Sequence, residues 1–175
     1  MYDTGMPDNP IRLASAVEAD VPVILRLIKA LAEYEELTHL VSATEADLHR
    51  WLFGPTPVAE VVMARAGDEA VGFALFFHNF STFLGRPGLY LEDLFVVPEW
   101  RGRGVGQALL AHLARVAVER GCGRMEWSVL DWNAPAIRFY TRLGAAPMEE
   151  WRICRLTGDA LERVAAMAGD APPSV

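Results

Sequence analysis

Two carboxylates and a glycine-rich turn lie within residues 90–107. Glu92 and Asp93 interrupt an apolar run, and three glycines alternate with other residues in Arg101-Gly102-Arg103-Gly104-Val105-Gly106. Two carboxylates inside an apolar strand are costly to bury without a partner or a functional role. A glycine turn that opens a helix exposes backbone N–H groups that can converge on an anion. The turn predicts a phosphate site, and the alternative is a tight turn with two solvated arginines.

The turn lacks the features of two common nucleotide-binding motifs. It is no Walker loop, because no Gly-Lys-Ser/Thr sequence ends it. It is no dinucleotide fingerprint either, because Gln107 occupies the position of the final glycine when counting starts at Gly102. That fingerprint also follows the first strand of its domain, whereas this strand comes late in the chain.

Composition restricts the class of protein and its partners. A chain of 175 residues, 52% hydrophobic and 22% charged, is typical of one soluble α/β domain. The net charge of −7 disfavours nucleic acid and suits a cationic small molecule, although it can serve solubility alone. The two cysteines form no CxxC and favour a reducing compartment, so we expect a cytoplasmic protein. We expect no membrane span and no metal site, because apolar stretches are short and the four histidines lack metal spacing.

The pattern predicts one α/β domain over residues 1–175, with a loose arm at 1–10 and a flexible tail at 168–175. Gly67-Asp68 signals a hairpin, and Thr44 with Asp47 signals a capping box. The expected strands are Ile11–Leu13, Val58–Ala66, Glu69–Phe77, Leu89–Val97, Arg124–Leu130 and Glu150–Leu156, with a loop over Phe80–Gly88. The expected helices follow Asp20, Thr44, the glycine turn, Asn133 and Thr157.

Alternation along the Leu89–Val97 strand separates its two carboxylates. It places Glu92 on one face with Tyr90, Leu94 and Val96, and Asp93 on the other face. For Asp93 we favour a satisfied structural pair.

The sequence around the turn resembles the GNAT acetyltransferases. Their acetyl-CoA signature, Arg/Gln-x-x-Gly-x-Gly/Ala after a strand, is matched by Arg101, Gly104 and Gly106. The resemblance extends from IRLASAVEAD to RLTGDAL. It is closest to the diamine branch, the spermidine/spermine and thialysine N-acetyltransferases, through LRLIKALAEYEE, YLEDLFVVPEWRGRGVG and WNAPAIRFYTRLGA.

This resemblance implies a GNAT-type fold with a mixed, mostly antiparallel central sheet flanked by helices. The sheet should splay between the Leu89–Val97 and Arg124–Leu130 strands. In the family that this sequence resembles, the glycine turn holds the coenzyme A pyrophosphate. The family also forms homodimers, so the resemblance implies a homodimer.

Two residues match the catalytic groups of the family. Glu92 matches the residue that binds the amine and removes its proton, either directly or through water, and Tyr140 matches the phenol that protonates the leaving sulfur. A tyrosine at this helix position would otherwise pack in the core.

The resemblance also implies contacts with both substrates. The thioester carbonyl should meet a backbone N–H of Phe95 or Val96, and either Glu149 or Glu150 should face the amine. Without the family, Arg142 would be an exposed helix arginine and each carboxylate a surface residue. The acetyl-CoA contacts are Leu94, Phe95, Val96, Arg101, Gly102, Arg103, Gly104, Val105, Gly106, Gln107, Asn133, Ala134, Pro135, Ala136 and Arg142, and the amine contacts are Tyr34, Glu35, Glu92, Glu126, Trp127, Ser128, Glu149 and Glu150.

The predicted activity is direct transfer of acetyl from acetyl-CoA to a primary amine of a small cationic molecule. Polyamines or diamines are the first expectation, and thialysine or another amino-acid side-chain amine is the second. The alternatives are a non-catalytic CoA-binding regulatory module and an enzyme that acetylates protein N-termini or lysines. The presence of both Glu92 and Tyr140 argues against the regulatory module.

Overall fold

The computed structural model describes residues 10–169 and divides the chain into two compact units, Met1–Ser128 and Val129–Val175. The predicted arm at residues 1–10 and the predicted tail at residues 168–175 lie mostly outside the described residues.

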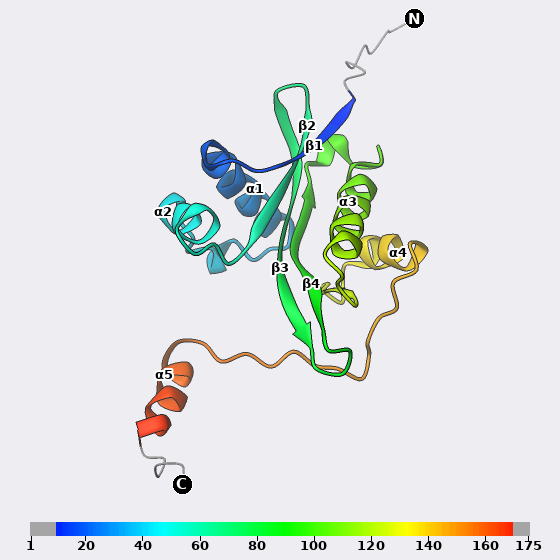
Figure 1. The fold of residues 1–175 in the computed structure, drawn as a ribbon. Helices are drawn as coiled ribbons and strands as arrows, with labels where there is room; N and C mark the ends of the chain where they lie inside the picture. The colour runs from blue at the N-terminus through cyan, green and yellow to red at the C-terminus, as the bar shows by residue number, and fades with distance from the viewer. Residues whose placement is uncertain (1–9, 170–175) are drawn as a thin grey trace, which may run out of the picture. The chain divides into compact units, whose positions relative to one another are not determined.

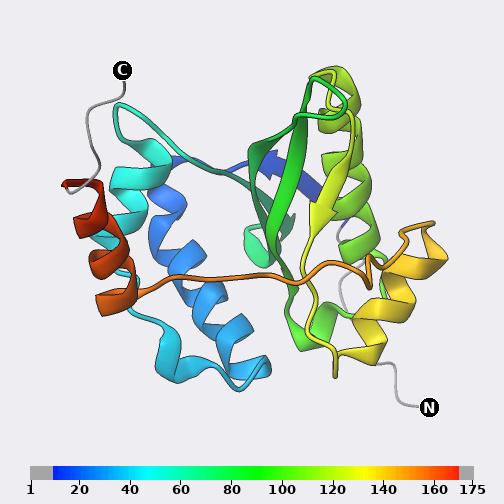
Figure 2. The same cartoon turned by 90° about the horizontal axis from the view of Figure 1, so that it is seen from below.

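The described part of the first unit contains a five-stranded sheet between helices (Figure 1). The strand order is β1-β2-β3-β4-β5, and all neighbours are antiparallel except the parallel pair β4 and β5. Helices α1 and α2 cover one face and α3 covers the other (Figures 1 and 2). The predicted mixed, mostly antiparallel sheet is therefore confirmed. Its strands are β1 Ile11–Ser15, β2 Glu60–Ala66, β3 Glu69–Ser81, β4 Arg86–Val96 and β5 Met125–Trp127, and its helices are α1 Val21–Tyr34, α2 Glu45–Leu48 and α3 Val105–Glu119.

A hydrophobic core fixes α1 against β3 and β4. Ile24 of α1 and Phe73 of β3 have no exposed surface, and Phe95 of β4 is only 4% exposed. They belong to one cluster of packed side chains. Each such side chain stabilises the fold by roughly 1.5–3 kcal/mol relative to an exposed one. This packing fixes α1 relative to β4.

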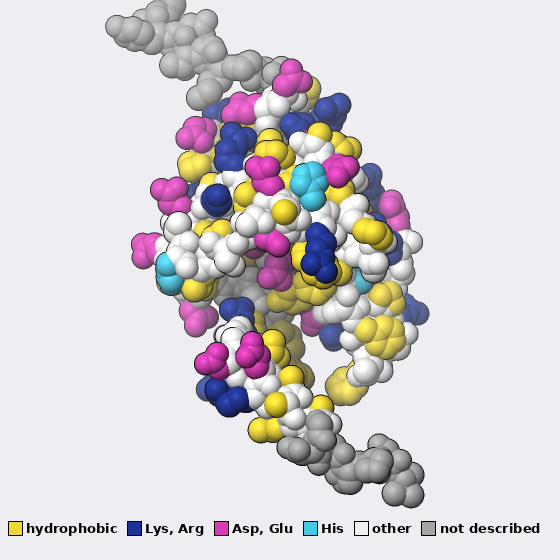
Figure 3. Space-filling model, turned by 90° about the vertical axis from the view of Figure 1, so that its left-hand side faces the viewer, with side chains coloured by type: hydrophobic (Ala, Val, Ile, Leu, Met, Phe, Trp, Pro, Cys, Tyr) yellow, Lys and Arg dark blue, Asp and Glu magenta, His cyan; other side chains and the backbone are white. Residues whose placement is uncertain are grey.

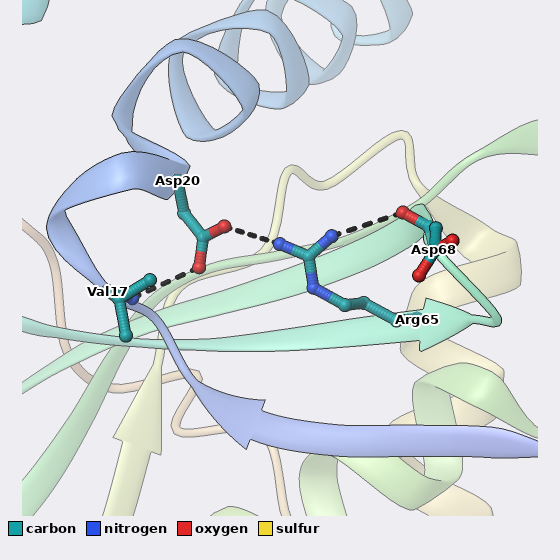
Figure 4. Close-up of polar contacts among 4 residues, drawn as sticks. All are labelled: Val17, Asp20, Arg65 and Asp68. Carbon is teal, nitrogen blue, oxygen red and sulfur yellow. Dashed lines mark hydrogen bonds and ion pairs between the residues drawn. The ribbon is translucent and has the colours of Figure 1, made fainter.

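The end of β2 is tied to the segment before α1 (Figure 4). Arg65 donates one hydrogen bond to the Asp20 carboxylate and another, 3.3 Å long, to the Asp68 carbonyl. The other Asp20 oxygen accepts from the Val17 N–H at 3.0 Å. The sequence suggests that the Asp20 side chain caps α1, but it does not. It closes the short 3₁₀ turn before α1 instead. The Asp20 carboxylate binds the guanidinium of Arg65 on β2 in place of the N–H groups at the start of α1.

Several element boundaries agree with the local signals that predict them. The Thr44 hydroxyl accepts from the Asp47 N–H at 3.2 Å, and the Asp47 carboxylate accepts from the Thr44 N–H at 3.0 Å, which confirms the capping box. Gly67, with φ of 61°, forms the predicted hairpin between β2 and β3. The helix after Thr44 ends at Leu48, and a π-helical turn, His49–Phe53, follows it.

Strand ends differ from the predictions because pairing with neighbours determines them. Much of the predicted Phe80–Gly88 loop is strand, since β3 and β4 pair as far as Ser81 with Arg86. Strand β5 is shorter than predicted, since only three of its residues pair with β4.

The described part of the second unit contains two α-helices, α4 Ala134–Arg142 and α5 Gly158–Ala166. The Asn133 side chain accepts from the Ala136 N–H at 3.3 Å, so the predicted N-cap is confirmed. Gly144, with φ of 95°, follows the end of α4, where a left-handed residue commonly ends a helix.

The predicted strand Glu150–Leu156 is wrong, because these residues form neither helix nor strand. Trp151 and Ile153 alternate with polar residues as in a strand, yet they are 72% and 71% exposed. A strand needs a neighbour to pair its backbone groups. The second unit has no other strand among its described residues that could serve.

The surface of the first unit carries mixed charge. On the side with α1 and α2, acidic and basic side chains are interspersed (Figure 3). The net charge of −7 therefore does not make this side uniformly acidic. A cation site must come from a local group of carboxylates.

Candidate active site

A β-bulge at Glu92 sets the geometry of the two strand carboxylates. Opposite β3, Asp93 pairs with Leu75 and Leu91 pairs with Phe76, so Glu92 is an extra residue without its own partner position. A bulge shifts the alternation of the strand by one residue. Bulges commonly re-aim side chains next to active sites.

The bulge places Asp93 on the face of the sheet covered by α1. Its cross-strand neighbour Leu75 packs against the core on that face, and cross-strand neighbours point the same way. Tyr90 pairs with Phe77 and shares this face. The prediction that Asp93 lies opposite Tyr90 is therefore wrong. Strict alternation failed because the bulge depends on pairing with β3, which the β4 sequence does not reveal.

Glu35, Glu92 and Asp93 form a group of interacting carboxylates. Burial, with the negative charges of Glu92 and Glu35, raises the pKa of Asp93 from 3.8 to about 6. Burial also raises the pKa of Glu35. Because Glu35 and Asp93 are partly desolvated, and the charges of Glu92 and Glu35 oppose that of Asp93, a cation bound beside them would favour the ionised forms of Glu35 and Asp93. The sequence alone favours a structural pair for Asp93 and does not predict it as part of the site.

The C-terminal end of α1 holds Glu35 in a defined conformation. Glu36 follows with φ of 61°, and the Leu37 N–H donates to the Ala32 carbonyl at 2.8 Å. This is the Schellman arrangement, in which glycine usually takes the left-handed position. A residue with a Cβ there costs roughly 1–2 kcal/mol. Strain of this kind is concentrated at functional sites.

The glycine turn leaves a bare backbone surface before α3. Gly102 and Gly104 have φ of 72° and 81°, and an added Cβ on either would meet no atom within 4 Å. Gly104 is the N-cap of α3, a helix of 15 residues. Such a turn can direct N–H groups at an anion, so the residues fit a phosphate-bearing cofactor. Arg103 adds a positive charge and lies 4.9 Å from the ring centre of Trp100.

Strands β4 and β5 separate near the bulge. Their pairing ends at Leu91 and Trp127, whereas β4 continues to Val96. The Val97 N–H donates to Val71 of β3 at 3.0 Å, so alternation directs the N–H of Val96 toward the β5 side. Of the two predicted thioester contacts, the geometry favours Val96 over Phe95.

Arg101 has its side chain turned onto the protein itself. Its Nε donates to the Val96 carbonyl at 3.0 Å, and its guanidinium lies 4.4 Å from the Tyr34 ring centre. Tyr34, a predicted amine contact, therefore lies beside the turn predicted to bind the cofactor.

The predicted amine contacts at the end of β5 have protein partners. Glu126 accepts from Arg124 at 2.8 Å and from Asn79 at 2.9 Å, so part of its charge is already compensated. The hydroxyls of Ser128 and Tyr90 are 2.9 Å apart.

The predicted site residues from Asn133 onward belong to the second unit. Asn133 caps α4, and Tyr140 is a half-buried residue of that helix, its ring centre 5.1 Å from that of Phe139. Glu149 and Glu150 lie in an exposed turn. The structure thus brings together Tyr34, Glu35, Glu92, Asp93, Val96 and the glycine turn within one unit. The roles of all these residues stay predictions.

Comparison with known proteins identifies the family. The profile of the Acetyltransferase (GNAT) family matches residues 24–145, more than half of the chain. The chain belongs to the GNAT acetyltransferases.

Individual GNAT relatives cover nearly the whole chain. It is 39% identical to a thialysine N-epsilon-acetyltransferase of Bos taurus, over 89% of this chain and 97% of the relative. It is 36% identical to an L-ornithine N5-acetyltransferase of Arabidopsis thaliana, over 87% of each. An integron cassette protein of V. cholerae has a similar structure, with a TM-score of 0.75 and 26% identity, over 89% of this chain and 97% of that one.

These findings establish the general activity of this GNAT protein. It is an N-acetyltransferase that takes acetyl-CoA as co-substrate and acetylates amines. Within residues 10–169, no helix is both long and apolar enough to cross a membrane, and no group of three or more His, Cys, Asp or Glu side chains could hold a metal ion. The family match includes parts of both units, and one domain over residues 1–175 stays a prediction, as does the homodimer.

The raised pKa of Asp93 makes the stability of this GNAT protein depend on pH. The folded protein binds the Asp93 proton more tightly than the unfolded chain, so the free energy of unfolding should fall as pH rises from 3.8 to about 6. The loss at neutral pH should be about 3 kcal/mol. Asp93→Asn should remove most of this dependence, and Glu35→Gln should weaken it, in urea unfolding at a series of pH values. Identical pH dependence in wild type and Asp93→Asn would contradict the assignment.

Proposed function

We propose that the protein transfers acetyl from acetyl-CoA directly to a primary amine of a small dication, a diamine or polyamine. The observation that carries this proposal is the group of Glu35, Glu92 and Asp93. Two partly desolvated carboxylates, Glu35 and Asp93, together with the exposed Glu92 offer more negative charge than one ammonium needs. A second ammonium on the same substrate would compensate the remainder.

Three groups of this chain would perform the chemistry. Glu92 accepts the proton that the ammonium must lose before it attacks, since an amine of pKa near 10 arrives protonated. The Val96 N–H donates to the thioester carbonyl oxygen, where negative charge develops. The Tyr140 hydroxyl donates a proton to the departing sulfur.

The glycine turn would bind the pyrophosphate of acetyl-CoA through its main chain. Its left-handed glycines and the N-terminus of α3 support this role. Residues at the start of α4 and Arg142 would add contacts along the cofactor.

A second candidate substrate is the side-chain amine of a free amino acid. Two relatives that match most of this chain are named for ornithine and thialysine acetylation. Such a substrate also carries an α-carboxylate, which the acidic group would repel. The diamine therefore stays the first proposal.

A panel of amines with acetyl-CoA tests the proposed function. The panel contains diamines, spermidine, ornithine, thialysine and a lysine-containing peptide, with thiol release and product mass as readouts. We expect the highest kcat/KM for a diamine or polyamine. A preference for ornithine or thialysine would select the second candidate. CoA binding without acetylation of any amine would favour a regulatory module, and a preference for the peptide would favour a protein acetyltransferase.

Glu92→Gln should lower the rate most near neutral pH. If Glu92 removes the ammonium proton, its loss should cost about 100-fold there, the lower end for a positioned base, and less at high pH, where the amine loses its proton in solution. Steady-state rates from pH 6.5 to 10 measure this, with Asp93→Asn as the neighbouring carboxylate for comparison. A loss of equal size at every pH would assign Glu92 to amine positioning instead.

A further inference from the structure

Arg101 contacts three parts of the first unit whose relative positions matter for the proposed reaction. Its Nε donates to the Val96 carbonyl on the separated edge of β4, at 3.0 Å. Its guanidinium lies 4.4 Å from the ring centre of Tyr34, the last residue of α1, and 5.5 Å from that of Phe95. Its own backbone begins the glycine turn.

These contacts restrict the guanidinium strongly. The Nε–H bond fixes the plane of the group against β4, and the aromatic rings contact the same cation. Arg101 and Tyr34 are both exposed, and a cation–π contact at an exposed site contributes roughly 0.5–1 kcal/mol. A lysine would keep the charge and lose the planar fork with its fixed Nε–H direction.

The accepting carbonyl makes this contact relevant to the reaction. In a strand, the N–H and C=O of one residue point to the same side. The Val96 carbonyl that Arg101 holds and the Val96 N–H proposed to meet the thioester therefore face the same separated edge. Any rotation of this residue moves both groups.

We propose that Arg101 is a positioning residue: it orients the Val96 N–H for the thioester and couples this donor to the Tyr34 end of the amine site. The proposal rests on the proposed function. It assigns the side chain of Arg101 to the protein, whereas the predicted phosphate contact of this residue is left to the main chain of the turn.

The two roles give different kinetics. Loss of a phosphate contact weakens coenzyme binding and leaves turnover at saturation unchanged. Displacement of the thioester donor lowers kcat with coenzyme affinity kept, and a misplacement of about 1 Å can cost up to about 100-fold. For Arg101→Lys we expect kcat to fall at least tenfold, with the Kd of CoA within about threefold of wild type.

A double-mutant cycle tests the coupling to Tyr34. Tyr34→Leu removes the ring and Tyr34→Phe keeps it, so Arg101→Lys should cost less in the Leu background than in wild type and the full amount in the Phe background. Arg50→Lys is the matched control, because Arg50 lies 4.6 Å from the ring centre of Trp51 away from this site. It should leave kcat unchanged.

Amide resonances of Val96 give a readout independent of turnover. They should shift in Arg101→Lys and in Tyr34→Leu, and not in Arg50→Lys. An unchanged Val96 resonance, additive losses in the cycle, or a raised CoA Kd with normal kcat would each overturn the proposal. If Arg101→Lys does not fold, the Val96 shift in Tyr34→Leu alone decides. If wild type acetylates no amine, the proposed function fails, while the resonances still test the contact.

Discussion

Tyr140→Phe is expected to lower the rate of amine acetylation by roughly 10²–10⁴, the usual contribution of a positioned general acid. The substitution keeps the ring that lies 5.1 Å from Phe139 within α4 and removes only the phenolic hydroxyl, and with it the proton. The free energy of unfolding should change by about 1 kcal/mol at most. Coenzyme affinity should be nearly kept, so the loss belongs in kcat. Stopped-flow or steady-state thiol release at saturating amine measures it.

The leaving group provides a chemical control for this prediction. A thioester of a thiol with low pKa needs no proton on departure, so it should recover much of the rate in Tyr140→Phe and gain little in wild type. Tyr90→Phe is a matched variant, because it also removes one hydroxyl. The hydroxyl of Tyr90 lies 2.9 Å from that of Ser128. Equal dependence on thiol pKa in Tyr140→Phe and wild type would assign Tyr140 to packing.

Features encoded by short-range sequence were predictable in this protein. The Thr44–Asp47 capping box, the Asn133 cap and the hairpin at Gly67 each depend on residues within three positions of one another. The glycine turn before α3 belongs to the same class, because its glycines and the following apolar periodicity are contiguous. The family followed from longer segments of matching sequence, and residues 24–145 bear it out.

Features that depend on distant partners were not predictable. The bulge at Glu92 exists only through the register of β4 with β3, and it moved Asp93 to the face of α1. The Arg101 side chain would be expected to face a phosphate from its motif, yet Tyr34 and Val96 hold it. Both cases follow from tertiary contacts that determine where a side chain points. The motif specifies only which residue types are present.

The second large effect should come from Gly104→Ala in the cofactor turn. Gly104 has φ of 81°, which a residue with a Cβ adopts at a cost of roughly 1–2 kcal/mol. An added Cβ at Gly104 would meet no protein atom within 4 Å. The new methyl group would therefore project into the space that we assign to the pyrophosphate. We expect the Kd of CoA, measured by calorimetry, to rise by about 100-fold, since one or two charge-assisted hydrogen bonds of about 1.5–3 kcal/mol each would be lost.

Gly121→Ala separates backbone strain from loss of the ligand. Gly121 follows the other end of α3 with φ of 69°, and an added Cβ there also meets nothing within 4 Å. Both variants should therefore lose similar stability in thermal unfolding. Only Gly104→Ala should lose coenzyme affinity, because only the N-terminal end of α3 presents N–H groups to an anion. Equal CoA affinity in the two variants would mean that the left-handed glycines serve the turn alone and that the pyrophosphate binds elsewhere.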